Sequence, residues 1–372
     1  MGLTLEQVAE QLHNSEKKVQ LIYAFNGTGK TRLSRAFRDK VAPKSDLDDT
    51  TEDLRKILYY NAFTEDLFFW DNDLDGDANR VFKIQPNEFT NWILEDQGQD
   101  QNIITQFQKY ADPKLTPRFN KDFSEVTFSF DRGDDTSVPN CKISKGEESL
   151  FIWSVFYAIL EAAIATINIP ELDDRDTNQF NDLEYVFIDD PVSSLDENHL
   201  IELAVTLAKL VESAPSDLKF IITTHNPLFY NVLHSELELN KGKKRDGCYL
   251  LESFEDGTFQ LQNKYGGTNT SFPYHLHVKN VLENAINTDC VERFHFTLIR
   301  NLYEKTASFL GYERWSQLLE SAVGGKDVYV RRINTFSHSS LSADQVRDPT
   351  PQEKQTVKFL LEHLINNYGY SK

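Results

Sequence analysis

Residues 24–31 read Ala-Phe-Asn-Gly-Thr-Gly-Lys-Thr and follow directly on an apolar run. Glycines let backbone N–H groups curl around a polyphosphate, a lysine supplies charge for the β- and γ-phosphates, and a threonine hydroxyl can hold Mg²⁺. Ala24 stands where this motif usually has its first glycine. The spacing therefore predicts a phosphate-binding loop for ATP or GTP with Mg²⁺, formed by Phe25, Asn26, Gly27, Thr28, Gly29, Lys30 and Thr31.

Two adjacent carboxylates end a second apolar run, residues 185–188. We expect Asp189 to hold Mg²⁺ together with Thr31, and Asp190 to act as the general base that polarises the attacking water. Related ATPases usually have glutamate at the second place, so the shorter Asp190 leaves fast hydrolysis open. His225 follows the next apolar run, 36 residues after Asp189, where a γ-phosphate sensor belongs. A histidine in such a place is otherwise more often structural.

A second phosphate cradle is predicted at the start of an apolar helix, at Ser144, Lys145, Gly146 and Glu147. A serine hydroxyl and N–H groups at a helix N-terminus suit the γ-phosphate of a nucleotide held on another subunit. Residues 193–196, Ser-Ser-Leu-Asp, match the D-loop that passes between subunits. Together the motifs stand in the order of an ABC-type ATPase. Because the signature cannot reach its own phosphate loop, the order predicts a head-to-tail homodimer.

The last hundred residues carry a different set of reactive side chains. Arg300 and Glu304 lie four residues apart between apolar positions at helical spacing, so both project from one helix face. Arg332 precedes His338 by six residues. A histidine can take the proton from a 2′-hydroxyl, an arginine can stabilise the charge on the phosphorane, and a carboxylate can orient either. These four residues predict metal-independent RNA cleavage, and a surface ion pair between Arg300 and Glu304 is the plain alternative.

We expect two domains to position these residues: an α/β domain, followed by a smaller all-α domain. Buried parallel strands are predicted at residues 19–25, 185–188 and 220–223, a half-exposed antiparallel strand at 123–130, and an apolar helix at 150–167. Glycine, small polar residues and proline mark a linker at 265–273. We therefore expect an ATPase domain over 1–264 and a helical domain over 274–372, with helices at about 275–287, 291–310, 313–322, 328–341 and 351–368.

Bulk composition narrows the class of protein. The 372 residues carry a net charge of −19, but residues 271–372 hold 12 lysines and arginines against 11 acidic residues, so the first 270 residues carry the acidity. An acidic body can keep nonspecific nucleic acid away while a neutral tail carries a local basic site, although acidity can also simply aid solubility. We expect no membrane span, because no apolar run approaches the ~20 residues that one requires. Three scattered cysteines predict reduced thiols, so we expect a cytoplasmic protein with no membrane partner.

The chain resembles the PrrC/RloC group of anticodon nucleases, bacterial ABC ATPases with a C-terminal ribonuclease of the HEPN kind. The likeness rests on residues 25–31, 187–196 and 224–227 for the ATPase half. The family's nuclease motif falls on Arg300, Glu304 and His338, and the Arg-x5-His pattern of HEPN ribonucleases falls on Arg332 and His338. The long arm with a zinc hook of RloC-like members is absent, so the chain is closer to the compact PrrC type.

The resemblance implies a function and partners. It implies a nuclease that stays silent until phage infection, with nucleotide occupancy gating the cleavage of tRNA in the anticodon loop. It also implies a restriction–modification complex or a phage factor as a partner. Two alternatives stay open on the sequence: a regulatory ABC ATPase whose helical tail docks a separate toxin or nuclease, and a RecF-like DNA-repair ATPase.

Overall fold

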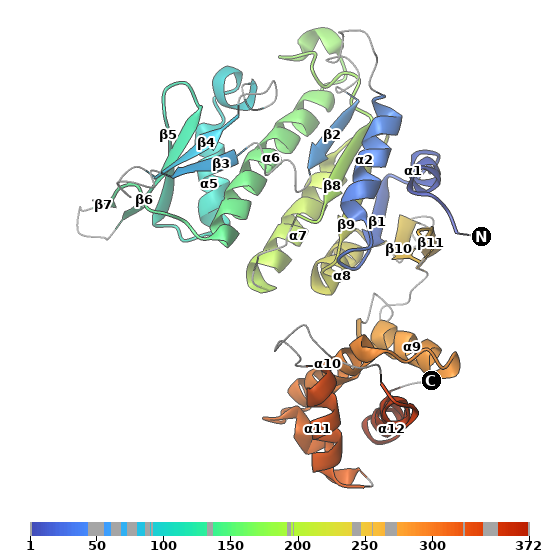
Figure 1. The fold of residues 1–372 in the computed structure, drawn as a ribbon. Helices are drawn as coiled ribbons and strands as arrows, with labels where there is room; N and C mark the ends of the chain where they lie inside the picture. The colour runs from blue at the N-terminus through green and yellow to red at the C-terminus, as the bar shows by residue number, and fades with distance from the viewer. Residues whose placement is uncertain are drawn as a thin grey trace. The chain divides into compact units, whose positions relative to one another are not determined.

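The computed structural model describes residues 2–43, 56–60, 68–72, 80–85, 90, 92–131, 137–191, 195, 197–239, 247–254, 256–264, 274–322, 324–337 and 349–370. The chain divides into two compact units, Met1–Ser271 and Phe272–Lys372 (Figure 1). The division falls inside residues 265–273, the segment predicted as a linker. Each unit is described by itself below.

The first unit is built on a six-stranded sheet in the order β11-β10-β1-β9-β8-β2. All neighbouring pairs are parallel except β10 with β11. The strands are β1 (Val19–Tyr23), β2 (Ile57–Tyr60), β8 (Tyr185–Asp189), β9 (Lys219–Thr224), β10 (Cys248–Ser253) and β11 (Phe259–Asn263). The three predicted parallel strands are thus confirmed as β1, β8 and β9. Because parallel strands end at one edge, the segments after them lie close together there.

Helices cover both faces of this sheet. α1 (Leu5–His13) and α2 (Lys30–Val41) pack with the sheet in one apolar cluster. On β2, Tyr59 belongs to that cluster, whereas Tyr60 contacts Trp153 and Phe156 of α6 (Lys145–Ile167). Successive residues of a strand point to opposite faces, so α2 and α6 lie on opposite sides. α7 (Glu197–Ser213) and α8 (Pro227–Glu236) pack against each other.

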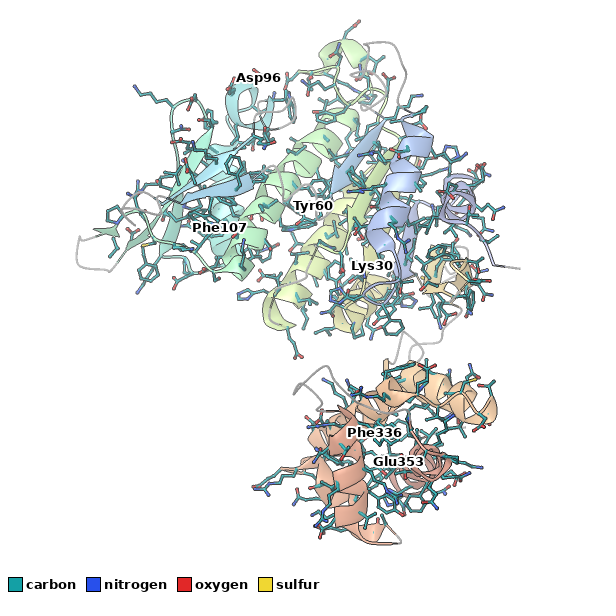
Figure 2. All side chains as sticks on the ribbon, in the orientation of Figure 1. Lys30, Tyr60, Asp96, Phe107, Phe336 and Glu353 are labelled. Atoms are coloured by element: carbon teal, nitrogen blue, oxygen red, sulfur yellow. The ribbon has the colours of Figure 1, made fainter. Side chains whose placement is uncertain are left out.

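A second, antiparallel sheet lies on the other side of α6 (Figure 1). It runs β3-β4-β6-β5, with β7 paired to β6. Phe151 of α6 packs against Phe107 and Phe128. Phe107 beside the second sheet and Tyr60 on the main sheet lie on different sides of α6 (Figure 2). Its elements are β3 (Phe68–Asn72), β4 (Arg80–Ile84), β5 (Leu115–Phe119), β6 (Glu125–Asp131) and β7 (Ser137–Val138), with α5 (Asp100–Tyr110), a π-helical turn at Trp92–Asp96 and a 3₁₀ turn at Leu172–Asp174.

The predicted strand at 123–130 is β6, with one difference. Val126 and Phe128 are fully buried as expected, but Ser129 on the opposite side is also buried. Its hydroxyl accepts a hydrogen bond from Arg118 at 2.8 Å. The polar side of β6 is therefore covered by β5 at Ser129, while Thr127 on the same side stays partly exposed.

α6 corrects the expectation about apolar length. Its 23 residues are long and apolar enough to cross a membrane by length and composition alone. However, 13 of its side chains, from Leu150 to Ile164, are buried in the first unit. α6 is therefore the central core helix of this unit.

The second unit is helical throughout the residues that the structure describes. It contains α9 (Tyr274–Asn287), α10 (Arg293–Leu310), α11 (Lys326–Ser337) and α12 (Pro351–Tyr368). The predicted helix at 313–322 is a 3₁₀ helix, Trp315–Ser321, and residues 338–341 of the predicted fourth helix lie outside the described residues. One apolar cluster that includes Phe296, Phe336 and Leu360 holds the helices together.

Candidate functional site

The loop between β1 and α2 has the backbone that phosphate binding requires. Gly27 and Gly29 have φ of 83° and 105°, in the left-handed region that glycine adopts without strain. Gly29 directly precedes the first turn of α2, and a Cβ there would lie 3.1 Å from the Arg32 guanidinium. Ala24 is fully buried, and its N–H donates to the Thr224 carbonyl at 3.0 Å. Ala24 therefore replaces the usual glycine at a position where the backbone is still hydrogen-bonded to β9, before the phosphate-binding loop begins.

Lys30 lies inside this loop. Its ammonium donates to the carbonyls of Ala24 and Phe25, both at 3.2 Å, and to Asn26 Oδ1 at 3.3 Å. It also pairs with Asp190 at 3.5 Å and is only 7% exposed. The charge is therefore held at the mouth of the loop, where the phosphates of a nucleotide would bind.

Thr31 and Asp189 meet, as the predicted Mg²⁺ site requires. Thr31 Oγ1 donates to Asp189 Oδ2 at 2.8 Å, and Thr223 Oγ1 donates to Asp189 Oδ1 at 2.5 Å. Burial raises the pKa of Asp189 above its ordinary value, and the two hydroxyls partly offset that effect. A hydroxyl and a carboxylate at hydrogen-bond distance are oxygen donors of the kind that Mg²⁺ prefers, so these residues fit the ion.

Asp190 and His225 form a close pair next to Lys30. His225 Nδ1 lies 2.6 Å from Asp190 Oδ2, and the His225 N–H donates to Asp190 Oδ1 at 3.3 Å. Burial raises the pKa of Asp190, but the hydrogen bonds from His225 and the charge of Lys30 outweigh burial and bring it below its ordinary value. Asp190 itself has a φ of 52°, which turns the chain sharply out of β8. The predicted base and sensor are therefore coupled to each other.

The predicted signature forms the N-terminus of α6. Ser144 is the N-cap: its Oγ accepts from the Glu147 N–H at 3.3 Å, and Glu147 Oε2 accepts from the Ser144 N–H at 2.6 Å. Lys145 is the first residue of the helix and reaches Glu148 at 2.8 Å, and Gly146 follows it in the first turn. This capping box places Ser144, Lys145, Gly146 and Glu147 at a positive helix end. Ser193, Ser194 and Asp196 of the predicted D-loop lie outside the described residues.

In the second unit, Arg300 is held from three directions. Its Nε donates to Glu304 Oε1 at 2.7 Å, its Nη1 donates to Asn334 Oδ1 at 3.4 Å, and its guanidinium lies 5.8 Å from the centre of the Trp315 ring. These residues line a pocket of about 670 Å³. The Arg300 side chain is 19% exposed and the Glu304 side chain 45%, so the arginine is partly buried while its carboxylate partner faces solvent.

The other two predicted nuclease residues lie differently. Arg332 Nη1 donates to Thr356 of α12 at 2.8 Å, and Arg332 is not among the residues that line the pocket, so it is not brought together with Arg300 and Glu304. His338 lies outside the described residues. Asn334, which contacts Arg300, is four residues before His338 in the sequence.

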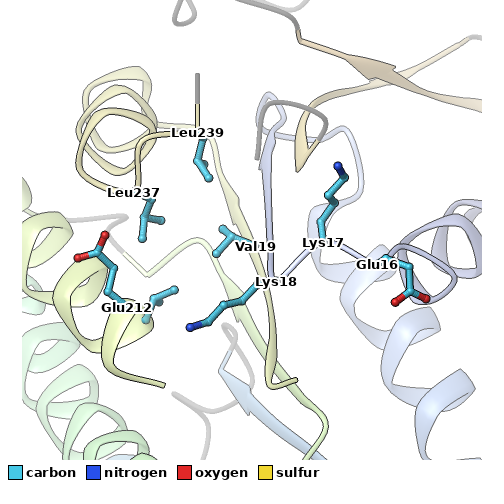
Figure 3. Close-up of a pocket in the computed structure, with 8 residues that line it drawn as sticks. Glu16, Lys17, Lys18, Val19, Glu212, Leu237 and Leu239 are labelled. Atoms are coloured by element: carbon cyan, nitrogen blue, oxygen red, sulfur yellow. The ribbon is translucent and has the colours of Figure 1, made fainter. Parts of the chain in front are cut away.

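Another cavity, of about 550 Å³, lies in the first unit beside the start of β1 (Figure 3). Lys17, Lys18 and Glu212 stand around an apolar floor that includes Val19 and Leu237. Val19 begins β1, whereas the phosphate loop follows the opposite end of the strand. This cavity is therefore separate from the nucleotide site.

Three residues of these sites were missed by sequence reasoning. Thr223 pairs in register with Asp189 across β8 and β9, and a polar residue near the end of a buried strand was the available signal. Asn334 had a weaker signal, its helical spacing before His338. Trp315 had none, because its contact with Arg300 depends on how the 3₁₀ helix packs against α10.

Comparison with known proteins decides the family. The chain is 56% identical to a protein of Escherichia coli named "Anticodon nuclease", over 397 aligned positions that cover 100% of this chain and 98% of that protein. The chain belongs to the PrrC-like anticodon nucleases. A model of the AAA domain family also matches residues 90–365, which include Asp189, His225 and Arg300. This anticodon nuclease homologue therefore has an AAA-type ATPase domain with a P-loop and mixed α/β content.

Solved heads of SMC proteins show a much weaker likeness to this anticodon nuclease homologue. The SMC head bound to the C-winged helix domain of ScpA is 12% identical with a TM-score of 0.33, over 67% of this chain and 90% of that chain. The SMC head from Thermotoga maritima is 13% identical with a TM-score of 0.31. The chain spans only 29% of the Pyrococcus yayanosii SMC head with a coiled coil and joint, at a TM-score of 0.30. These scores support no inference about function.

Proposed function

We propose that this protein is a nucleotide-gated endoribonuclease that cleaves tRNA in the anticodon loop, without a metal ion at the cleavage site, as a defence against phage. The observation that carries the proposal is the Arg300–Glu304–Asn334 cluster in its pocket, in a chain that is 56% identical over its full length to an anticodon nuclease.

The cleavage step follows from the residue types. His338 takes the proton from a ribose 2′-hydroxyl, and the oxygen attacks the adjacent phosphorus. Arg300 stabilises the extra negative charge on the phosphorane oxygens, and Glu304 keeps the guanidinium oriented through its 2.7 Å hydrogen bond. The bond from phosphorus to the 5′-oxygen breaks, solvent water protonates the leaving oxygen, and His338 returns its proton to solvent. The products are one fragment with a 2′,3′-cyclic phosphate and one with a free 5′-hydroxyl.

The nucleotide site controls whether RNA is cleaved. Bound Mg²⁺ neutralises phosphate charge during hydrolysis, and Thr31 and Asp189 would hold it. Lys30 contacts the phosphates. Asp190 orients water, and its hydrogen bond to His225 Nδ1 leaves the Nε2 side of that ring to contact the γ-phosphate. The ABC-type signature at Ser144 would complete this site on a second copy of the chain, in a head-to-tail homodimer.

Closure of that dimer would then bring helical HEPN-like domains together on one RNA strand. A restriction–modification complex or a phage factor would hold or release this state in the cytoplasm. Arg332 has a supporting part in this proposal, because it ties α11, the helix that leads toward His338, to α12.

Incubation of the purified chain with bulk tRNA, Mg²⁺ and nucleotide tests the proposal. Parallel reactions receive excess EDTA in place of Mg²⁺, and halves that persist with EDTA would support cleavage without a metal ion. We expect discrete tRNA halves that end in a cyclic phosphate, and no halves from the variant His338→Ala, which should keep wild-type nucleotide turnover. The absence of halves from the wild type would favour a docking ATPase, and DNA-stimulated hydrolysis would favour a DNA-repair ATPase.

A further inference from the structure

The pocket in the second unit has a wall that the cleavage chemistry does not use. One side is the face of α10 that carries Arg300 and Glu304, and the other is the turn and 3₁₀ start at residues 311–316. Gly311 ends α10 with a φ of 78°, in the left-handed region, and turns the chain so that these residues line the pocket.

Tyr312 stands out on this wall. Tyr312 is one of the residues that line the pocket and is 44% exposed, whereas the more exposed aromatic residues Phe294 and Phe309 do not line it. The ring of the nearby Trp315 already packs against other residues of the protein. Its centre lies 6.2 Å from the centre of the Tyr303 ring, and the Arg300 guanidinium lies over its face. Of the two aromatic residues that line the pocket, Tyr312 and Trp315, Tyr312 is therefore the one whose ring is the better candidate to contact a ligand.

Charge and size indicate which part of a ligand fits. Two arginines, Arg300 and Arg314, and two glutamates, Glu304 and Glu313, line the pocket, so their formal charges cancel. A balanced pocket can therefore hold a neutral group with hydrogen-bond donors and acceptors next to the phosphate that Arg300 contacts. The volume of about 670 Å³ lies within the ~300–1,000 Å³ of small-molecule sites, which accommodates a nucleobase with its sugar.

We propose that Tyr312 is the stacking platform for an unpaired nucleobase of the RNA, next to the bond at which Arg300 acts. The inference rests on the proposed nuclease function and deepens it. Proteins that recognise RNA loops stack splayed bases on aromatic rings, because the bases of a paired helix are not accessible in this way. Loss of one such stack weakens RNA binding by roughly 5- to 150-fold.

The test measures binding without cleavage, on the full-length chain. A fluorescently labelled RNA hairpin with an unpaired loop carries 2′-O-methyl riboses, so no 2′-hydroxyl can attack, and its Kd is read by fluorescence anisotropy. Tyr312→Ala should raise the Kd for the hairpin by 5- to 150-fold. Tyr312→Phe should keep it within about twofold, since the ring is retained. A fully paired RNA duplex should bind equally to all three proteins.

Phe309→Ala is the matched control. Phe309 lies three residues earlier and is 89% exposed, but it does not line the pocket, so its removal should leave the Kd unchanged. An unchanged Kd for Tyr312→Ala, or equal losses for Tyr312→Phe and Tyr312→Ala, would overturn the inference. A changed sedimentation coefficient with an unchanged Kd would assign the ring to a protein interface and would also overturn it. If Tyr312→Ala weakens hairpin binding while the wild type cleaves no natural tRNA, the subsite stands and the nuclease proposal fails.

Discussion

At the scale of single residues, the reactive groups are held by neighbours before any ligand is considered. Lys30 lies among carbonyl oxygens of its own loop, Asp190 lies against His225, and Arg300 lies between Glu304 and Trp315. Such fixed orientation lowers the cost of arranging groups at the moment of reaction. The chemistry at each site therefore depends on the shape of the side chain as well as its charge.

The substitution Arg300→Lys separates shape from charge in RNA cleavage. A lysine keeps the positive charge but cannot contact Glu304, Asn334 and the Trp315 ring at once. We expect cleavage to fall by roughly 100-fold or more, the usual cost of one lost donor to the transition state. Single-turnover cleavage of tRNA measures this, with thermal unfolding to show that the variant is folded. A loss below about threefold would mean that the arginine is only an ion-pair partner of Glu304.

The substitution Asp190→Asn removes the proposed base and weakens the hold on His225. Nucleotide hydrolysis should fall by roughly 10²- to 10⁴-fold, while nucleotide binding should persist through Lys30. Because the pKa of Asp190 lies below its ordinary 3.8, the carboxylate stays charged as the pH falls from 7 to 5. Protonation of Asp190 should therefore not reduce the rate of hydrolysis by the wild type between pH 7 and pH 5. Wild-type turnover by Asp190→Asn would place the base elsewhere.

At the scale of elements, one polar network joins three helices of the second unit. Tyr303 of α10 donates to the Leu360 carbonyl at 3.1 Å, and its hydroxyl lies 2.9 Å from His363 Nδ1. His363 Nε2 lies 3.0 Å from Ser321 Oγ at the end of the 3₁₀ helix. These contacts suit a neutral imidazole with one N–H donated to Tyr303 and one nitrogen accepting from Ser321. Tyr303 and His363 are buried, so the protonation state of His363 affects the stability of this unit.

This network predicts a pH effect on stability. Burial lowers the pKa of His363 below 6.5, so the unfolded chain binds a proton more readily than the folded chain. The free energy of unfolding therefore decreases as the pH falls below about 6.5. The thermal midpoint of the wild type should decrease between pH 7 and pH 5 by more than that of His363→Gln. His275 and His295, whose pKa values burial also lowers, act equally in both proteins. Parallel pH curves for the two proteins would contradict this role.

Elements with a local signal could be predicted from the sequence, and elements set by distant pairing could not. The phosphate loop and β8 carry their pattern in a few adjacent residues. The antiparallel sheet was foreseen only at β6, because β3 and β4 depend on partners far along the chain. The 3₁₀ helix at Trp315–Ser321 was expected as an ordinary helix, since spacing alone does not separate the two. The contact of Arg300 with Asn334 joins helices whose packing no short pattern encodes.

At the scale of the whole molecule, the chain combines an acidic ATPase unit with a nearly neutral helical unit. Residues 271–372 carry about as many basic as acidic residues, against a net charge of −19 for the whole chain. An acidic first unit disfavours nonspecific RNA binding, so RNA should be selected by the pocket around Arg300 and Tyr312. The two units are then expected to divide the work, with nucleotide bound in the first and RNA cleaved in the second.

The nucleotide response of tRNA cleavage in the variant Lys30→Ala tests this division of work most directly. Cleavage is measured at saturating ATP or GTP with Mg²⁺ and without nucleotide, in the wild type and in the variant. We expect nucleotide to stimulate cleavage in the wild type by roughly tenfold or more. In Lys30→Ala we expect slow cleavage that nucleotide does not change. Equal cleavage by both proteins, with and without nucleotide, would contradict it.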